Sequence, residues 1–256
     1  MDNIYAFPQY YEIAFSYRDI IREVDVMEQA IAQYSHIPVE NVLELACGNS
    51  PHMVELASRG YNYHGLDLSP TMLEFAQEKT RIHDFTANFY LANLVDFEVK
   101  EPLDFIYIML GSLYVGDTKE LLSHFSSVER ALKPGGLYFL DWCVDFSPLD
   151  NVQDSWVMRK NKITVTTHYT TRPYNPAEQL YQERISFTVK DRGKQHRLVH
   201  SGLRRAIFPQ EFLLVSTKLH NFEFLGWWNN WNWQAPLGEN EGREEIVRPI
   251  TILRRV

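Results

Sequence analysis

The chain has 256 residues, of which 45% are apolar, and its formal net charge is −8 at pH 7. This length suffices for one α/β domain with an insertion, and the acidic balance disfavours a nucleic-acid-binding surface, which is usually basic. With two cysteines, Cys47 and Cys143, a reducing, cytoplasmic compartment is expected rather than a disulfide framework. The first residues lack the pattern of a signal peptide, and no apolar run approaches the length of a membrane span.

The first half of the chain is predicted to alternate between helices and parallel strands. Residues 18–35 carry apolar side chains at helical spacing, which predicts an amphipathic helix. Residues 104–110 are nearly all apolar, as is typical of a central parallel strand. The other elements predicted here are strands near 42–45, 61–67, 89–92 and 137–141 and helices that begin near His52, Ser69 and Asp117.

The pattern changes in the second half. Residues 155–206 are predicted to form antiparallel strands, because polar and apolar side chains alternate over 180–190 and turn residues occupy 172–176 and 191–194. The remaining predicted elements are a helix near 209–219 and strands near 222–228 and 245–253.

These elements together predict one α/β domain over residues 1–256. The expected fold is a Rossmann-like, mostly parallel sheet of seven strands with helices on both faces. The antiparallel insertion over 155–206 is expected to form a lid above the site.

The turn after the first predicted strand is the most informative feature of the chain. Residues 42–45 form a buried strand, the small residues Ala46, Cys47 and Gly48 follow, and Asp67 closes the next strand. Small residues let a ligand approach the backbone, and the helix beyond them offers free N–H groups. In a doubly wound sheet an acid at the position of Asp67 binds the two hydroxyls of a ribose. The alternative is a strand-end acid that caps the following helix.

This turn resembles motif I of the class I S-adenosylmethionine-dependent methyltransferases, which runs acid-x-small-x-Gly-x-Gly. Glu44, Ala46, Gly48 and Ser50 occupy these positions, so two of the family's glycine positions are substituted. Further segments resemble other motifs of the family in the same order along the chain: 66–73 (D-x-S-x-x-M-L), 91–97 (G-D-x-x-D-F), 131–136 (L-x-P-G-G) and the last strand, 248–255.

The resemblance implies that S-adenosylmethionine is the cofactor. Asp67 would bind its ribose, and Asn93 would accept a hydrogen bond from the adenine amino group where the family commonly has Asp. For Leu68 and Met72, core packing is the alternative, because packing against adenine would follow the same pattern. The other residues that the motifs place at the cofactor are Glu44, Ala46, Gly48, Leu94 and Leu110.

Two N-terminal features resemble the small-molecule branch of the family, such as aminosugar N-methyltransferases and glycine N-methyltransferase. In that branch an arginine on the helix before the first strand binds the cofactor's carboxylate, and Arg22 occupies that place. Its alternative role is an ion pair with Asp25 on the same helix. Residues 11–15 resemble the Tyr-Asp-x-x-Tyr start of these enzymes, which places Tyr11 on the substrate side.

Methyl transfer to a small-molecule acceptor, at nitrogen or oxygen, is the predicted function. Asp141 ends the fifth strand at the rim of the sheet and is the candidate general base, with Tyr11 second. A solvated strand-end acid is the alternative for Asp141. Residues 110–114 lack the Asp/Asn-Pro-Pro-aromatic signature of adenine-N6 and glutamine-amide methylation, and they end in Tyr114, a candidate substrate contact.

The predicted lid and the segment after the sixth strand supply further substrate contacts. Arg204 or Arg205 is predicted to hold an anionic group of the acceptor; a solvated basic face is the alternative. Trp231 lies in a run of tryptophan and asparagine that would stack on a planar or sugar part, or else fill the core or an interface. The prediction of an anion contact is based on the cluster of cations in the lid, which comprises Lys190, Arg192, Lys194, Arg197, Arg204 and Arg205.

Two functions of other classes stay open. One is a catalytically silent protein that binds S-adenosylmethionine, because Ala46 and Ser50 replace glycines of the motif. The other is a nicotinamide-dependent oxidoreductase, although the G-x-G-x-x-G fingerprint is absent. The nine histidines show no metal-ligand spacing, so no metal is expected. Neither a nucleic acid nor a membrane is expected as a partner.

Overall fold

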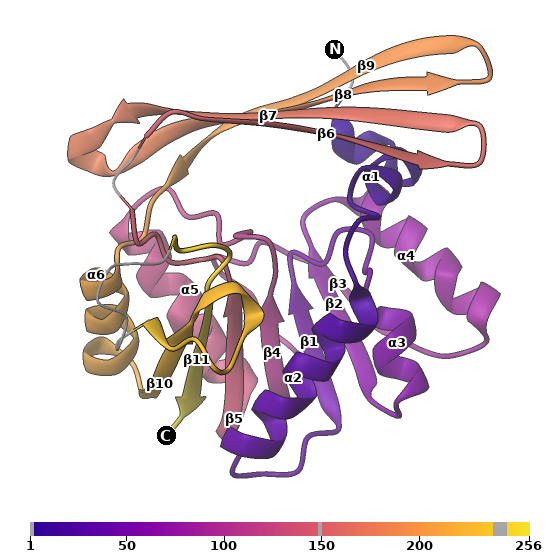
Figure 1. The fold of residues 1–256 in the computed structure, drawn as a ribbon. Helices are drawn as coiled ribbons and strands as arrows, with labels where there is room; N and C mark the ends of the chain where they lie inside the picture. The colour runs from indigo at the N-terminus through magenta and orange to yellow at the C-terminus, as the bar shows by residue number, and fades with distance from the viewer. Residues whose placement is uncertain (1–2, 148–149, 238–244) are drawn as a thin grey trace.

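The computed structural model describes residues 3–147, 150–237 and 245–256. An α/β body is built on a seven-stranded sheet, and a four-stranded antiparallel sheet lies across one end of this body (Figure 1). Within the described residues, no helix has the length and apolar character needed to cross a membrane. The predicted fold class, a Rossmann-like mostly parallel sheet with an inserted antiparallel sheet, is confirmed.

The body sheet has the strand order β10-β11-β5-β4-β1-β2-β3. β11 runs antiparallel to β5 and β10, while the other neighbouring pairs are parallel. The strand order reverses between β1 and β4, and open α/β sheets bind ligands at the carboxyl ends beside such a point. The strands are β1 (Asn41–Leu45), β2 (Asn62–Asp67), β3 (Asn88–Leu91), β4 (Leu103–Ile108), β5 (Leu132–Asp141), β10 (Phe222–Trp228) and β11 (Ile250–Arg255).

Helices cover both faces of this sheet, because its central strands carry apolar side chains on both sides. On one face α2 and α3 pack against Tyr107 and Phe139, and on the other α5 and α6 pack against Tyr138 and Leu140 (Figure 1). The helical elements are η1 (Ile4–Ala6), α1 (Pro8–Ala14), α2 (Ile20–Tyr34), α3 (Met53–Ser58), α4 (Pro70–His83), α5 (Thr118–Ala131), η2 (Pro176–Glu178, in the inserted sheet), α6 (Pro209–Leu213), the π-helix η3 (Leu214–Leu219) and η4 (Asn229–Trp231).

Capping residues fix the starts of the helices that frame the carboxyl rim of the sheet. Ser69 Oγ accepts a hydrogen bond from the Met72 N–H at 3.4 Å, with Pro70 in the first position of α4. Asp117 caps α5 in the same way and accepts from the Glu120 N–H at 2.8 Å. Because α4 starts so soon after β2, its N-terminus stays beside the end of that strand.

The antiparallel sheet is a meander inserted between β5 and α6. It begins slightly before the predicted residue 155 and has the predicted alternation of faces. Its strands are β6 (Val152–Lys160), β7 (Ile163–Asn175), β8 (Leu180–Asp191) and β9 (Lys194–Arg205), in that order across the sheet.

The inner face of the inserted sheet, which meets the body, has an apolar half and a polar half. In the apolar half, Phe187 and Val189 pack against η1 and α1. In the polar half, Glu183 of β8 and Arg204 of β9 contact Tyr114, which follows β4 in the body. The polar half therefore lies over the carboxyl rim of the body sheet.

Two elements near the C-terminus differ from the prediction. The predicted helix is α-helical only in α6 and then widens into the π-helix η3. The last strand begins at Ile250 rather than near Glu245, because Asn229 binds the preceding residues. Its amide donates to the Glu245 carbonyl at 2.9 Å, and its oxygen accepts from the Val247 N–H at 2.7 Å.

Candidate active site

The turn after β1 has a left-handed backbone at alternate residues. Ala46, Gly48 and Ser50 have φ values of 51°, 52° and 49°, a region that glycine adopts at least cost. Glycine at these three positions of the motif would adopt this backbone freely, and Ala46 and Ser50, which replace it, each carry strain of about 1–2 kcal/mol. A Cβ built on Gly48 meets no atom within 4 Å, so open space lies over the backbone at that point.

Asp67 is oriented by two backbone N–H groups at the rim. Its Oδ2 accepts from Gly48 at 2.7 Å and its Oδ1 from Ser69 at 2.8 Å. Burial raises the pKa of the Asp67 carboxyl, and these two hydrogen bonds oppose the rise. Each oxygen can accept a further hydrogen bond, and the neighbouring Leu68 is 69% exposed, so a ligand can approach from this side.

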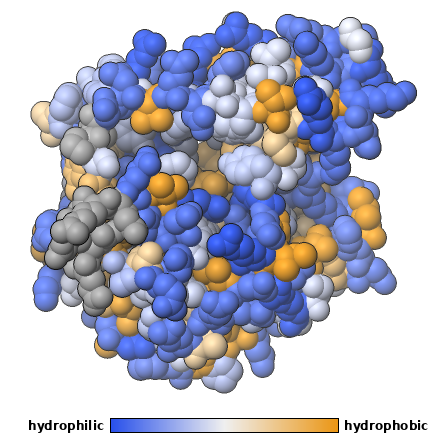
Figure 2. Space-filling model, viewed as in Figure 1, coloured by the Kyte–Doolittle hydropathy of each residue, from blue (hydrophilic) through white to orange (hydrophobic). Residues whose placement is uncertain are grey.

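A cavity of about 270 Å³ opens beside the turn, at the carboxyl ends of β1 and β4. Lys79 of α4 links two segments that line the cavity. Its Nζ donates to the Asn49 carbonyl at 2.8 Å and pairs with Glu12 of α1 at 2.6 Å. Figure 2 shows a recess between the inserted sheet and the body on this face of the molecule. The walls of the cavity include Tyr11, Arg18, Glu44, Gly48, Leu110 and Ser112.

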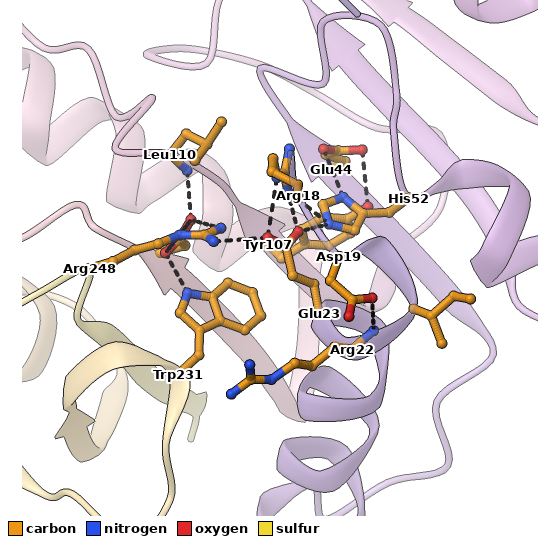
Figure 3. A network of polar contacts seen from close by, with 12 residues as sticks. Arg18, Asp19, Arg22, Glu23, Glu44, His52, Tyr107, Leu110, Trp231 and Arg248 are labelled. Carbon is orange, nitrogen blue, oxygen red and sulfur yellow. Dashed lines mark hydrogen bonds and ion pairs between the residues drawn. The ribbon is translucent and has the colours of Figure 1, made fainter. Parts of the chain in front are cut away.

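Behind the cavity lies a buried network of charged side chains (Figure 3). Its central carboxylate is Glu23 of α2, which pairs with Arg18 at 2.5 Å, Arg248 at 2.8 Å and His52 at 2.9 Å. Burial alone would raise the pKa of Glu23, but the hydrogen bonds from His52 and Arg18 and the charges of both arginines outweigh it. The pKa of Glu23 is therefore well below its ordinary value.

Glu44, the acid of the motif, is only 2% exposed and joins the turn to this network. It accepts hydrogen bonds from Tyr63 at 2.5 Å and Tyr107 at 3.0 Å, and its Oε1 lies 3.4 Å from His52 Nδ1. Glu44 also forms part of the cavity wall. Through these hydrogen bonds Glu44, on β1, is linked to Tyr63 of β2 and Tyr107 of β4 beneath the cavity.

Arg18 lines the cavity, whereas Arg22 does not. Arg22 is exposed on α2, and its backbone N–H, not its side chain, binds Asp19 (Figure 3). The side chain of Arg18 is 5% exposed and approaches the site from just before the helix. The structure thus does not bring the predicted carboxylate ligand to the cavity. The signal that separates the two arginines is Asp19, whose capping role starts the helix at Ile20.

Asp141 and Trp231 belong to the network and not to the cavity wall. Asp141 is fully buried, accepts from the Leu110 N–H and the Trp231 Nε1–H at 2.8 Å each, and pairs with Arg248 at 2.8 Å. With these partners it has no access to an acceptor, so the geometry speaks against the general-base role. Tyr11 lines the cavity, but burial raises its pKa far above its ordinary value, so its phenol stays protonated at neutral pH.

The other predicted cofactor residues lie at different depths. Met72 is fully buried and Leu94 is 8% exposed, so both lie in the core. Asn93 is exposed, and its Oδ1 accepts from the Val95 N–H at 3.0 Å. Leu110 stands at the cavity with a φ of 53°, which turns the chain at the end of β4.

The two lid arginines predicted to contact the acceptor, Arg204 and Arg205, lie in different surroundings. Arg205 is held by Glu211 at 2.5 Å, away from the cavity. Arg204 reaches the polar half of the inner face, where its guanidinium lies 5.3 Å from the Tyr114 ring and 3.5 Å from Glu183. Its Nε is buried without a hydrogen-bond partner. Of these two arginines, Arg204 is therefore the one that reaches the inner face of the inserted sheet.

Glu183 is a buried acid that the sequence reasoning missed. It is 4% exposed and accepts hydrogen bonds from the hydroxyls of Tyr114 and Tyr169, the latter at 2.7 Å. Burial chiefly raises the pKa values of Tyr5 and Tyr11, and the charge of Glu183 adds to both shifts. The available signal was the alternation over 180–190, which puts this acid on an otherwise apolar face.

Known proteins that are similar to this chain are methyltransferases. A family model described as a methyltransferase domain matches residues 42–136. A protein from Geobacillus sp. (strain WCH70), described as a methyltransferase, is 26% identical over 180 residues, which cover 70% of this chain and 72% of that protein. The dTDP-3-amino-3,4,6-trideoxy-alpha-D-glucopyranose N,N-dimethyltransferase of Streptomyces venezuelae is 27% identical over 157 residues. These residues cover 60% of this chain and 63% of that enzyme.

A similar fold occurs in the crystal structure of an S-adenosylmethionine-dependent methyltransferase from Clostridium acetobutylicum ATCC 824. It is 18% identical in sequence, has a TM-score of 0.78 and covers 96% of both chains. Residues 42–136 therefore form a methyltransferase domain, and the strand order of the whole sheet is that of an S-adenosylmethionine-dependent methyltransferase fold. Its cofactor is S-adenosylmethionine, and the open space over Gly48 and the free acceptor positions of Asp67 fit that molecule.

Replacing Asp67 with alanine is expected to weaken binding of S-adenosylmethionine and of its demethylated product alike. Losing hydrogen bonds to an ionised acceptor costs about 1.5–3 kcal/mol, which is roughly tenfold or more in affinity. Isothermal titration calorimetry measures this change, with Asp96→Ala, an exposed acid beside Arg130, as the control. Unchanged affinity in Asp67→Ala would show that the ribose binds elsewhere.

Proposed function

We propose that this methyltransferase acts on a nitrogen atom of a small molecule bound between the inserted sheet and the body. The observation that carries the proposal is Glu183, a buried carboxylate among tyrosines in the polar half of the inner face. A carboxylate surrounded by aromatic rings suits an amino group, because the acid accepts its N–H and the ring faces attract a positively charged nitrogen.

The residues around the cavity define what the protein contributes to this reaction. Bound S-adenosylmethionine supplies a methyl group on a sulfonium, which is a good leaving group. The protein must align the acceptor nitrogen with the methyl carbon and exclude water. An ammonium loses a proton before its lone pair attacks, and in this proposal Glu183 takes up that proton after the acceptor displaces one of its tyrosine partners. The protonated phenol of Tyr11 serves as a hydrogen-bond donor to the acceptor.

Two further observations support a small, polar acceptor. The similar enzyme of Streptomyces venezuelae is named for a dTDP-linked amino sugar. In this chain the guanidinium of Arg204 lies 5.3 Å from the Tyr114 ring and 5.6 Å from the Tyr181 ring, and its positive charge suits an anionic part of the acceptor, such as a phosphate. A hydroxyl acceptor is the alternative, with Glu183 taking the hydroxyl proton.

The decisive experiment is methyl transfer from labelled S-adenosylmethionine to a panel of matched acceptors. Each pair in the panel shares one skeleton, a nucleotide-linked sugar or a free sugar, and differs only in carrying an amino or a hydroxyl group. We expect label to be transferred to the amino member of a pair. Transfer only to hydroxyl members would overturn the nitrogen assignment. Cofactor binding without transfer to any member would favour the catalytically silent alternative.

Glu183→Gln is expected to lower kcat/KM for the acceptor by roughly 10- to 100-fold, the scale of one lost hydrogen bond to a charged group. Glutamine preserves the shape of the side chain, so the affinity for S-adenosylmethionine should stay within about twofold. Steady-state kinetics and calorimetry separate the two effects. The matched control is Glu178→Gln, which changes an exposed acid in the short connection between β7 and β8. Equal kcat/KM in the two variants would remove Glu183 from the acceptor site.

A further inference from the structure

Most of the cations in the inserted sheet lie away from the cavity. Residues 152–205 contain eleven Lys and Arg residues and four Asp and Glu residues, whereas the whole chain contains 25 and 33. The sheet is therefore a basic part of an acidic protein.

Five of these cations share the outer face of the sheet, which is turned away from the body (Figure 1). Side chains of a strand alternate between its two faces. The outer face consists of the even-numbered residues of 164–172 and 182–190 and of the residues on β6 and β9 that pair with them. Its exposed cations are Arg159, Arg172, Arg184, Lys190 and Arg197.

The four acids of the sheet do not neutralise this face. Glu183 is buried on the inner face, and the register with β7 puts Asp154 on that face as well. Asp191 lies at the end of β8, where its Oδ2 accepts a hydrogen bond from the Tyr10 hydroxyl at 3.0 Å. The fourth acid, Glu178, lies in η2, outside the strands.

Ion pairs within the chain leave the charge of the outer face exposed. Among the described residues, the exposed cations of the sheet that form an ion pair are Lys160, with Glu12 at 3.5 Å, and Arg192, with Asp191 at 4.0 Å. Lys160 belongs to the inner face and Arg192 to the turn between β8 and β9. A surface that gathers charge of one sign attracts a partner of the opposite sign.

The outer face is large enough for a specific interface. Its strands are 9, 13, 12 and 12 residues long. Four neighbouring strands of this length cover an area about 19 Å wide and about 40 Å long. A standard protein–protein interface occupies about 800 Å² on each partner, which is close to this area. A partner can therefore bind here without contacting the body.

The residue types on the outer face favour a protein as the anionic partner. Four of the five cations are arginine, whose planar fork binds carboxylates in bidentate fashion and which is enriched at protein interfaces. Within the described strands, the outer face carries no Phe, Tyr or Trp. Such rings stack on the bases of single-stranded nucleic acid and anchor proteins in membrane surfaces.

The spacing of the cations points the same way. Arg159 of β6 and Lys190 of β8 both lie beside Thr164 of β7, so their backbones are about 10 Å apart. A DNA duplex carries one charge for about every 1.7 Å of its axis, which calls for a denser row of cations. Separate carboxylates on a folded protein match the wider spacing.

We propose that the outer face of the inserted sheet binds an acidic surface of another protein. Carboxylates of that partner pair with the exposed cations, and the threonine and serine side chains between them pack against it. Glu183 lies on the other face of the sheet, and the cavity lies in the body. Docking at the outer face is therefore independent of which acceptor the enzyme methylates.

Binding to a defined acidic polypeptide tests the proposal. The probe is immobilised poly-L-glutamate, and biolayer interferometry at physiological salt gives its affinity. The triple variant Arg159→Glu, Lys190→Glu, Arg197→Glu is expected to bind at least tenfold more weakly than the unaltered protein, the scale of a few lost surface ion pairs. If the unaltered protein does not bind poly-L-glutamate, the proposal is wrong.

The matched control changes the net charge by the same amount on the body. Lys100→Glu, Lys119→Glu, Lys218→Glu alters three exposed lysines, and salt screens their distant effect, so its affinity should stay within about threefold. Equal weakening in the two triple variants would show that only net charge matters and would overturn the proposal.

The affinity for S-adenosylmethionine, measured by calorimetry, checks that each variant is folded. If the outer-face triple variant does not fold, Arg172→Glu with Arg184→Glu gives the same comparison.

Other occupants of the outer face are tested in parallel. A short DNA duplex and vesicles of equal parts phosphatidylcholine and phosphatidylserine present phosphate in place of carboxylate, and sedimentation velocity detects a second copy of the chain. We expect poly-L-glutamate to bind more tightly than the duplex or the vesicles, and the unaltered protein and the outer-face variant to sediment alike. Tighter binding of the duplex or the vesicles, or self-association that the outer-face variant abolishes, would contradict an acidic protein as the partner.

Discussion

Replacing Asp141 with alanine is expected to destabilise the fold by about 3–5 kcal/mol, because it removes the fully buried carboxylate that binds the partly buried guanidinium of Arg248 in bidentate fashion. The change also removes the acceptor for the Leu110 N–H and the Trp231 Nε1–H. Unfolding in urea, followed by circular dichroism, measures the loss. This is among the largest effects we expect from a single substitution in the chain.

The control separates this buried pair from an ordinary surface pair. Asp96→Ala breaks the exposed contact with Arg130, at 3.3 Å, and should cost no more than about 1 kcal/mol. Asp141→Asn keeps the shape of the side chain and tests for catalysis. A variant of normal stability whose kcat collapses would restore Asp141 as a general base and contradict the structural role.

We propose that Arg18, the arginine that lines the cavity, binds the cofactor's carboxylate. Arg18→Ala is then expected to weaken S-adenosylmethionine by roughly 10- to 100-fold, because the carboxylate loses a charge-assisted partner. Methylthioadenosine has no carboxylate and should bind within about threefold of its normal affinity. Arg18→Lys keeps the charge but loses the planar fork, so its effect should be intermediate. Calorimetry with both ligands gives the two affinities directly.

Arg22→Ala is the matched control, since Arg22 is an exposed arginine one helical turn away. We expect normal affinity for both ligands in this variant. If Arg22→Ala selectively weakens S-adenosylmethionine and Arg18→Ala does not, the carboxylate is bound at the outer face of α2. If Arg18→Ala weakens both ligands equally, Arg18 acts through the network and not on the carboxylate.

The element order and the cofactor turn were accessible from sequence because their signals are local. The caps at Ser69 and Asp117 mark helix starts within a few residues. The positive φ of Gly48 belongs to the tight turn between β1 and α3, and Asp67 comes close to it because β1 and β2 are parallel neighbours. The alternation over 180–190 likewise specified a strand with one buried face.

The predicted roles of Asp141 and Trp231 differ from their positions in the structure, because both residues make contacts with parts of the chain that are distant in sequence. Asp141 lies at a strand end, as predicted, but Arg248, 107 positions away, occupies its carboxylate. Trp231 was expected at the acceptor and instead binds Asp141 from inside the core. No spacing pattern in the sequence predicts either contact. Both form only when β11 pairs with β5 and brings the segment before β11 to the end of β5.

The sequence by itself determined that this chain folds as an α/β methyltransferase and where its cofactor turn lies. Periodicity, caps and small residues act over one element or one turn, and they leave their marks in neighbouring positions. Tertiary structure alone decided that Arg18 faces the cavity, that His52 joins Glu23 to Glu44, and that Glu183 meets Tyr114. Burial and the pairing of charges select among chemically equivalent side chains, and both depend on distances that exist only in the folded chain.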